Sequence, residues 1–169
     1  DLYGAVVWPD ASADVYWAFP WRFWHFEKGG APGTYDVALM SSRDGLHFDY
    51  VDDRRPFVRT GREGTAGSSR VRVLPSPIVV NDTMLIYLYL TNLAEMKGPS
   101  GGYNVTTDHR PMESALGVVR IRKDGFVCLA SPTYGKEALV TTKALFASAG
   151  GDLWVNVDSL NGELRVELF

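Results

Sequence analysis

Short apolar runs constrain the fold of this chain more than any other feature of its sequence. Most contain five to nine residues, are bounded by Gly, Pro, Asn or Asp, and show almost no helical periodicity. The runs cover residues 2–8, 15–19, 35–40, 46–51, 78–80, 84–90, 115–121, 126–130, 153–157 and 164–169. Short runs separated by turn residues are typical of β-strands. We therefore predict an all-β protein.

The pattern of runs occurs twice, in residues 3–51 and again in residues 76–130. Each copy reads strand, turn, strand, long loop, strand, Asp-Gly, strand. Asp44-Gly45 and Asp124-Gly125 stand between apolar runs, where the freedom of glycine at positive φ permits a tight hairpin. Four antiparallel strands repeated as a unit are typical of a propeller blade. The pattern favours a propeller over a sandwich for residues 1–131, with units at 1–60 and 71–131.

The remaining residues, 132–169, have a different pattern. Residues 151–158 and 162–168 alternate apolar and polar side chains, and Asn161-Gly162 supplies a turn between them. Such alternation indicates strands with one packed face and one wet face. We interpret this segment as the start of a β-sandwich, and the whole chain as a piece of a larger protein.

Two stretches resemble a known family. Residues 35–48 are similar to the A-x-S-x-D-G-x-x-W strand–turn–strand of five-bladed-propeller glycosidases, with Phe48 where Trp is usual. Residues 117–129, followed by 139–145 and 152–157, resemble the join between last blade and β-sandwich in proteins related to glycoside hydrolase families 32 and 43. The resemblance implies the C-terminal blades of a propeller whose funnel holds a carbohydrate of the fructan or furanoside type.

The chain lacks the catalytic signatures of that family, such as Asn-Asp-Pro-Asn-Gly, Arg-Asp-Pro or Glu-Cys. We therefore assign no catalytic residue, and whether the parent protein is an enzyme stays open. We predict a fragment of a glycoside hydrolase-like protein that needs its remaining blades or a partner chain. The alternative is a non-catalytic structural or adhesive propeller in an extracellular assembly.

Residues 19–27 form the most unusual stretch, with several aromatics and a histidine after a strand. Trp21, Trp24 and His25 are candidates for a platform that stacks on sugar rings, with Arg22 as a hydrogen-bond donor to hydroxyls. The competing interpretation is that these side chains pack between blades, where aromatics contribute much of the buried area.

The polar loop 61–69 is the richest in glycine and contains a further candidate, Glu63. Glu63 and Arg62 either face a substrate or form a solvated pair of little energetic weight. The loop lacks the Gly-Lys-Ser/Thr ending and the following helix of a phosphate-binding loop.

Charge and length exclude two classes of partner. The chain carries 17 basic and 20 acidic residues, a formal net charge of -3, so it lacks the positive surface that nucleic acids require. No apolar run approaches the roughly 20 residues needed to span a bilayer. We predict neither a nucleic-acid partner nor a membrane span.

The sequence also predicts no metal site and no other cofactor. The lone Cys128 excludes an internal disulfide and a cysteine-based zinc site, and its apolar run predicts a buried thiol. His25, His47 and His109 have no ligand partner at metal spacing. We expect no cofactor.

Two sequons bear on localisation. Asn81-Asp-Thr83 and Asn104-Val-Thr106 fit the N-glycosylation pattern, and we predict both to lie in turns or loops. They favour an extracellular or cell-surface glycoprotein if the source is eukaryotic.

Overall fold

The computed structural model describes residues 1–25, 33–92, 94–97, 103–106, 113–131, 133, 135–144, 151–159 and 162–169, with the backbone alone for 94–97 and 103–106. The chain divides into two units, Asp1–Val127 and Cys128–Phe169. The strands are β1 (Leu2–Asp10), β2 (Val15–Trp24), β3 (Thr34–Ala38), β4 (Met40–Ser42), β5 (Asp49–Tyr50), β6 (Pro56–Val58), β7 (Arg70–Val73), β8 (Ile78–Val80), β9 (Thr83–Thr91), β10 (Ala94–Lys97), β11 (Tyr103–Thr106) and β12 (Ser114–Arg122). The described residues contain no helix, and the all-β prediction is confirmed.

Ten of these strands form one mixed sheet in the first unit. Its order is β12-β9-β7-β3-β2-β4-β5, with β1 paired to β2, β6 to β3 and β8 to β9. Strands β10 and β11 form a separate two-stranded sheet. Among the described strands every pairing is antiparallel except that of β3 with β7, where Tyr35 lies opposite Arg70. This parallel contact joins the two halves of the sheet edge to edge. One half contains β12, β9, β7 and β8, and the other contains β3, β2, β4, β5, β1 and β6.

Both copies of the sequence repeat fold as antiparallel meanders. In the first copy β1, β2, β4 and β5 pair in succession, and in the second β8, β9 and β12 do so. Residues 126–130, predicted as a fourth strand of the second copy, form no strand. The assignment of the two meanders to propeller blades stays a prediction.

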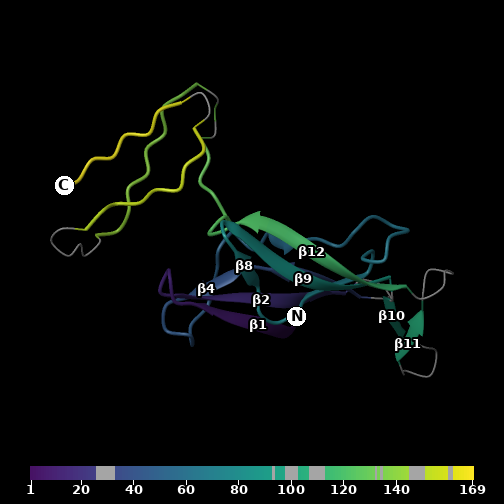
Figure 1. The fold of residues 1–169 in the computed structure, drawn as a ribbon. Helices are drawn as coiled ribbons and strands as arrows, with labels where there is room; N and C mark the ends of the chain where they lie inside the picture. The colour runs from purple at the N-terminus through teal and green to yellow at the C-terminus, as the bar shows by residue number, and fades with distance from the viewer. Residues whose placement is uncertain are drawn as a thin grey trace. The chain divides into compact units, whose positions relative to one another are not determined.

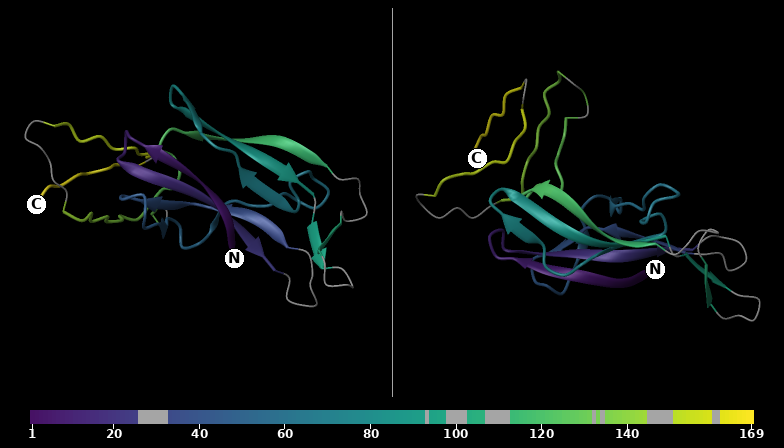
Figure 2. Two further views of the ribbon diagram at one scale, coloured as in Figure 1. Left: turned by 90° about the horizontal axis from the view of Figure 1, so that it is seen from below. Right: turned by 45° about the vertical axis from the view of Figure 1, so that its right-hand side comes forward.

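The two halves of the sheet face each other around a shared core. Figure 1 and the right-hand view of Figure 2 show β9 and β12 lying over β1 and β2. The core consists of Phe19, Val37, Leu39, Val71, Val73, Met84, Ile86, Leu88 and Phe126. These residues come from β2, β3, β7, β9 and the segments that follow β3 and β12, so neither half buries its apolar face without the other.

Phe126 makes the closest ring contact between the halves. Its ring centroid lies 4.4 Å from that of Trp17 and 6.2 Å from those of Phe19 and Phe57. Phe126 is 7% exposed. Burying a side chain of this size stabilises a fold by roughly 1.5–3 kcal/mol.

The two Asp-Gly pairs adopt different turns. Gly45 has the positive φ of 74° that the sequence predicts, but it stands in a loop of six residues, 43–48, between β4 and β5. In the second pair Asp124 has the positive φ, 61°. A Cβ on Gly125 would lie 2.9 Å from the carbonyl oxygen of Arg122, so this position needs glycine for space.

The described residues of the second unit are exposed and form no hydrogen-bonded strand, although residues 153–157 and 164–169 were predicted as strands. The expectation of a buried thiol is wrong, because Cys128 is exposed. Alternation of apolar and polar residues creates one face that can be buried, but burial requires a second layer against that face. The prediction of a β-sandwich start at 132–169 stays a prediction.

Replacing the ring that joins the two halves should unfold the first unit at lower denaturant. Phe126→Ala removes a buried aromatic side chain, and we expect the free energy of unfolding to fall by about 3–5 kcal/mol. Leu46→Ala is the control, because Leu46 is 80% exposed and its loss should change stability by less than about 0.5 kcal/mol. Urea unfolding followed by tryptophan fluorescence measures both. Equal midpoints for the two variants would contradict this account of the core.

Candidate functional site

A row of three side chains crosses β2, β4 and β5. Trp17 lies opposite Ser41, and Ser41 lies opposite Asp49. Residues directly opposite one another in antiparallel strands share a face and have neighbouring Cβ atoms. The pairing register therefore places an indole ring, a hydroxyl and a carboxylate side by side, with Trp17 and Ser41 half-buried and Asp49 exposed.

These three residues line an open groove of about 490 Å³. Val15 of β2 and Ala13 of the turn that precedes it lie along the same groove, and the loop 43–48 contributes Arg43, Asp44 and His47. One side of Trp17 packs on Phe126 of the core. The groove thus has an aromatic wall backed by the core and polar groups around it.

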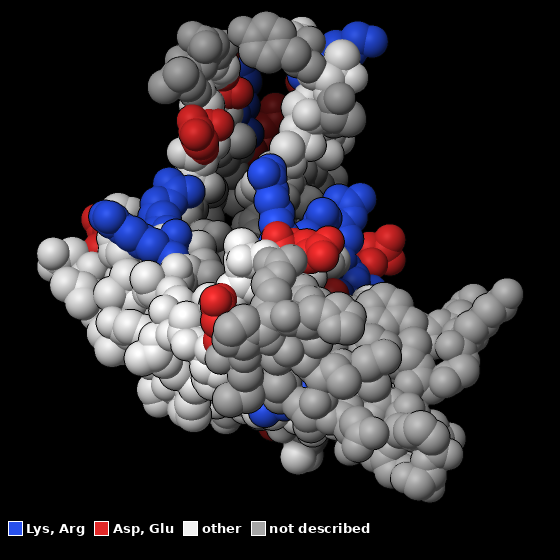
Figure 3. Space-filling view, turned by 90° about the vertical axis from the view of Figure 1, so that its right-hand side faces the viewer, with Lys and Arg blue, Asp and Glu red and all other residues white. Residues whose placement is uncertain are grey.

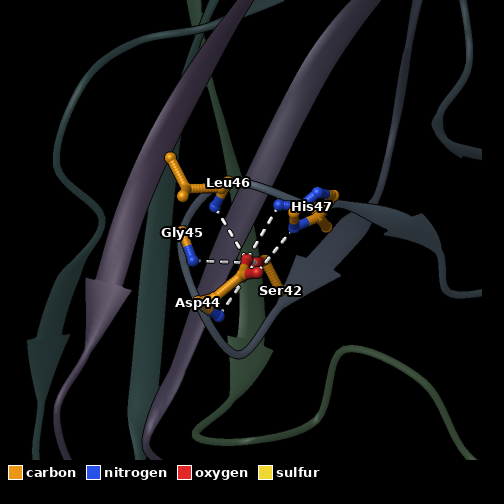
Figure 4. Close-up of polar contacts among 5 residues, drawn as sticks. All are labelled: Ser42, Asp44, Gly45, Leu46 and His47. Carbon is orange, nitrogen blue, oxygen red and sulfur yellow. Dashed lines mark hydrogen bonds and ion pairs between the residues drawn. The ribbon is translucent and has the colours of Figure 1, made fainter.

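The loop beside the groove is shaped by the Asp44 carboxylate (Figure 4). Its Oδ1 accepts hydrogen bonds from the N–H of Leu46 and of His47, both at 2.8 Å, and its Oδ2 lies 2.6 Å from His47 Nδ1. Ser42 Oγ donates to the same carboxylate and accepts from the N–H of Asp44 and of Gly45. Asp and Ser side chains commonly fix turns in this way.

These hydrogen bonds also set the charges in the groove. Donation from the backbone N–H and ring of His47, from Leu46 and from Ser42 holds the pKa of Asp44 well below its usual range. The hydrogen bond and charge of Asp44 raise the pKa of His47, and the charge of Asp49 adds to this effect. His47 therefore keeps its positive charge to higher pH than an ordinary histidine.

Arg43 connects the loop to the turn between β1 and β2. Its Nη1 donates to the carbonyl oxygens of Ala13 and Asp14 at 2.7 and 2.6 Å. Asp14 has a positive φ of 49°. In the same turn, Asp10 accepts hydrogen bonds from the N–H and the hydroxyl of Ser12. Side-chain hydrogen bonds thus fix both segments that border the groove, the turn between β1 and β2 and the loop 43–48.

The aromatic platform predicted from the sequence is divided between the faces of β2. Successive side chains of a strand point to opposite faces, so Trp21 and Trp24, three positions apart, point to opposite sides. Trp21 is half-buried beneath the guanidinium of Arg72, whose Cζ lies 5.1 Å from the ring centroid. Trp24 is 52% exposed and lies 5.1 Å from the guanidinium of Arg22.

Arg22, the predicted donor to sugar hydroxyls, lies in a buried ion pair. Its Nε and Nη2 donate to the two carboxylate oxygens of Asp36 at 2.7 and 2.8 Å, and its Nη1 donates to the carbonyl oxygen of Arg54. Arg22 is 6% exposed and Asp36 is 7% exposed. Through these contacts the guanidinium of Arg22 links β2 to β3 and to the segment before β6.

The other predicted site residues that the structure describes are not among those lining the groove. His25 is exposed, with its Nε2 2.8 Å from Asp1 Oδ2, and Glu63 is exposed in the loop 61–69. Asn81 is exposed in the turn between β8 and β9 with a positive φ of 52°. Asn104 lies in β11 opposite Met96 and not in the predicted loop, and His109 is outside the described residues.

Sequence reasoning missed the groove. Its residues are distant in sequence, and only the register of β2, β4 and β5 brings Trp17 next to Ser41 and Asp49. The one available signal was the motif at residues 35–48, which contains Ser41, Ser42 and Asp44. From the sequence alone, that motif indicates the fold and does not predict a binding site.

Comparison with known proteins gave no match to a family model, to a curated protein or to a solved structure. Within the described part of the chain, no three His, Cys, Asp or Glu side chains are grouped to hold a metal ion. Nor do the described residues include a helix long and apolar enough to cross a bilayer. On the face in Figure 3, basic and acidic side chains lie intermixed among the described atoms.

The hydrogen bond between Asp44 and His47 predicts a shifted titration. In a pH titration of the histidine ring resonances by NMR, the midpoint of His47 should lie above that of an ordinary exposed histidine. Asp44→Asn should move it back toward the ordinary value, while Asp49→Asn should move it less, because Asp49 acts only through its charge. Since the folded pKa of His47 is raised and that of Asp44 is lowered, the stability contributed by this pair is present between pH 3.8 and 6.5. It is lost as the pH rises through the folded pKa of His47 or falls through that of Asp44. An unshifted His47 in the native protein would contradict this assignment.

The buried ion pair of Arg22 with Asp36 predicts a large effect on stability. Asp36→Ala leaves the guanidinium buried without its carboxylate, and we expect the free energy of unfolding to fall by about 3–5 kcal/mol. Arg22→Met combined with Asp36→Leu replaces both charges by apolar groups and should recover most of that loss. Urea unfolding of the two variants provides the comparison. A double variant as unstable as Asp36→Ala would show that the charges themselves are required.

Proposed function

We propose that this chain is the glycan-binding part of a larger glycoside hydrolase-like protein, and that the glycan lies in the groove across β2, β4 and β5. The observation that carries the proposal is the row of Trp17, Ser41 and Asp49 in an open groove of about 490 Å³. Binding sites for small ligands combine apolar or aromatic walls with a few placed polar groups. A sugar ring matches this combination, because it has apolar C–H faces and a rim of hydroxyls.

Each group in the groove has a part in this proposal. The indole of Trp17 packs against a C–H face of the sugar, and the Asp49 carboxylate accepts hydrogen bonds from its hydroxyls. Ser41 both donates and accepts. The protonated ring of His47 donates a hydrogen bond from Nε2, because Nδ1 is already held by Asp44.

The proposal concerns binding and not cleavage in this groove. Asp44 accepts hydrogen bonds from three residues, and its low pKa leaves it without a proton to donate at neutral pH. In the glycosidases that residues 35–48 resemble, cleavage depends on three carboxylates, and we propose that these belong to other parts of the parent protein.

The resemblance also supplies the architectural part of the proposal. The meander β1-β2-β4-β5 and the meander β8-β9-β12 are two blades of a propeller, and residues 132–169 begin a β-sandwich. The exposed position of Asn81 in a turn suits a glycosylation acceptor and supports an extracellular or cell-surface protein.

A second candidate function is that of a non-catalytic structural or adhesive propeller. It is favoured by the exposed apolar face of β9 and β12, where Tyr87 is 39%, Tyr89 37%, Leu116 75% and Val118 53% exposed. Exposed apolar surface of this kind is typical of protein contacts. In this candidate the face of the sheet, and not the groove, is the functional surface.

Removing one groove carboxylate distinguishes these candidates. We expect Asp49→Ala to weaken binding of furanoside oligosaccharides about 10–100-fold, because a hydrogen bond to a charged group contributes about 1.5–3 kcal/mol. The melting temperature should stay unchanged, since Asp49 is exposed. Isothermal titration calorimetry with fructan and arabinan oligosaccharides measures the affinity.

Two control variants make the result specific. Asp52→Ala removes an exposed carboxylate that does not line the groove, and should leave affinity unchanged. Trp24→Ala tests the platform predicted from the sequence. The groove proposal is overturned if Trp24→Ala abolishes binding while Asp49→Ala has no effect, and absence of glycan binding by the native protein favours the adhesive candidate.

A further inference from the structure

Among the strands that the structure describes, β12 is the last of the ten-stranded sheet and pairs with β9 alone. The hydrogen bonds at its two ends show which backbone groups face β9. Glu113 accepts from the N–H of Asn92 and donates to Asn92 Oδ1, and Lys123 donates to the carbonyl oxygen of Asp82. Because backbone groups alternate along a strand, the odd-numbered residues of β12 bond toward β9. The N–H and C=O groups of residues 114, 116, 118, 120 and 122 therefore point to the open edge.

This edge lacks two of the features that usually prevent strands from pairing, a bulge and a proline, and its charged side chains are Arg120 and Arg122. Its register with β9 is continuous over all nine residues, without a bulge, and β12 contains no proline. Leu116 and Val118 are 75% and 53% exposed on its outer face. A long, regular strand with exposed apolar residues is a template for pairing with another strand.

We propose that two copies of this chain form a two-fold symmetric dimer in which β12 pairs antiparallel with β12 of the second copy, centred on Val118. In this register Val118 lies opposite Val118, Leu116 opposite Arg120, and Ser114 opposite Arg122 of the second copy. All of these residues direct their backbone groups to the open edge, so each opposing pair exchanges two hydrogen bonds. The two sheets become one continuous sheet.

Charge complementarity identifies the occupant as a second copy and fixes the register. With Val118 at the centre, Glu113 lies opposite Lys123 of the second copy at both ends of the paired strands. A register centred on residue 117 or 119 instead places Glu113 opposite Ile121 or Gly125. Opposite charges directly across an antiparallel pair stabilise it, and like charges destabilise it.

The outer face of the paired strands is also complementary. Arg120 of one copy lies beside Leu116 of the other, so its aliphatic part covers the exposed leucine while its charge reaches water. Within each copy Leu116 and Val118 lie opposite Tyr89 and Tyr87 of β9. The dimer therefore joins two exposed apolar strips, Tyr87, Tyr89, Leu116 and Val118 of each copy, into one band. This inference is independent of the glycan groove.

Sedimentation equilibrium of the full chain tests the proposal. The native protein should show a reversible monomer–dimer equilibrium. Glu113→Lys and Lys123→Glu should each weaken the dimer by roughly tenfold, because each places like charges opposite one another at both ends. The double variant Glu113→Lys/Lys123→Glu restores both pairs and should recover the native affinity.

A backbone variant tests the edge itself. Val118→Pro removes the outward N–H at the centre of the interface but no hydrogen bond to β9, and should yield a monomer whose circular dichroism matches that of the native protein. If this variant does not fold, the charge-swap series alone decides. A native protein that stays monomeric, a dimer unaffected by either single charge reversal, or a double swap that fails to recover affinity would each overturn the proposal.

Discussion

The ring of Phe126 supports both the core and the groove. Phe126 follows β12, the last strand of the sheet. Its ring centroid lies 4.4 Å from that of Trp17, which belongs to the opposite half. Because Trp17 also lines the groove, the core holds the aromatic wall of the candidate site in place. A side chain fixed by packing loses little conformational freedom when a ligand binds. The contact that joins the halves of the sheet thus also fixes the aromatic wall of the groove.

The two-residue period of a strand explains where the candidate residues lie. It places Trp21 and Trp24 on opposite faces of β2, so the two indoles cannot form one platform. The same geometry, applied across strands and not along one, places Trp17, Ser41 and Asp49 in a row. A surface built from three strands can therefore be more continuous than one built from neighbouring residues of a single strand.

Much of the strand pattern could be predicted from the sequence, and the pairing that builds the site could not. The apolar runs at residues 2–8, 84–90 and 115–121 coincide with β1, β9 and β12, because each run reports a local preference. The parallel contact of Tyr35 with Arg70 and the ion pair of Arg22 with Asp36 depend on which strands meet, which no local pattern encodes. Residues 153–157 show that a clear local pattern is also not sufficient. Their apolar and polar residues alternate, but the described residues form no strand there.

Ser42, Asp44 and His47 combine the residue types of a nucleophile, an acid and a base, and their hydrogen bonds decide what they do. In a catalytic triad the histidine lies between the serine and the carboxylate and takes the serine proton. Here the carboxylate of Asp44 lies in the middle and accepts from both Ser42 and His47. Ser42 is 5% exposed and its hydroxyl is bonded to a group of low basicity. The trio therefore fixes the shape and charge of the groove, which suits recognition of a ligand and not chemical attack upon it.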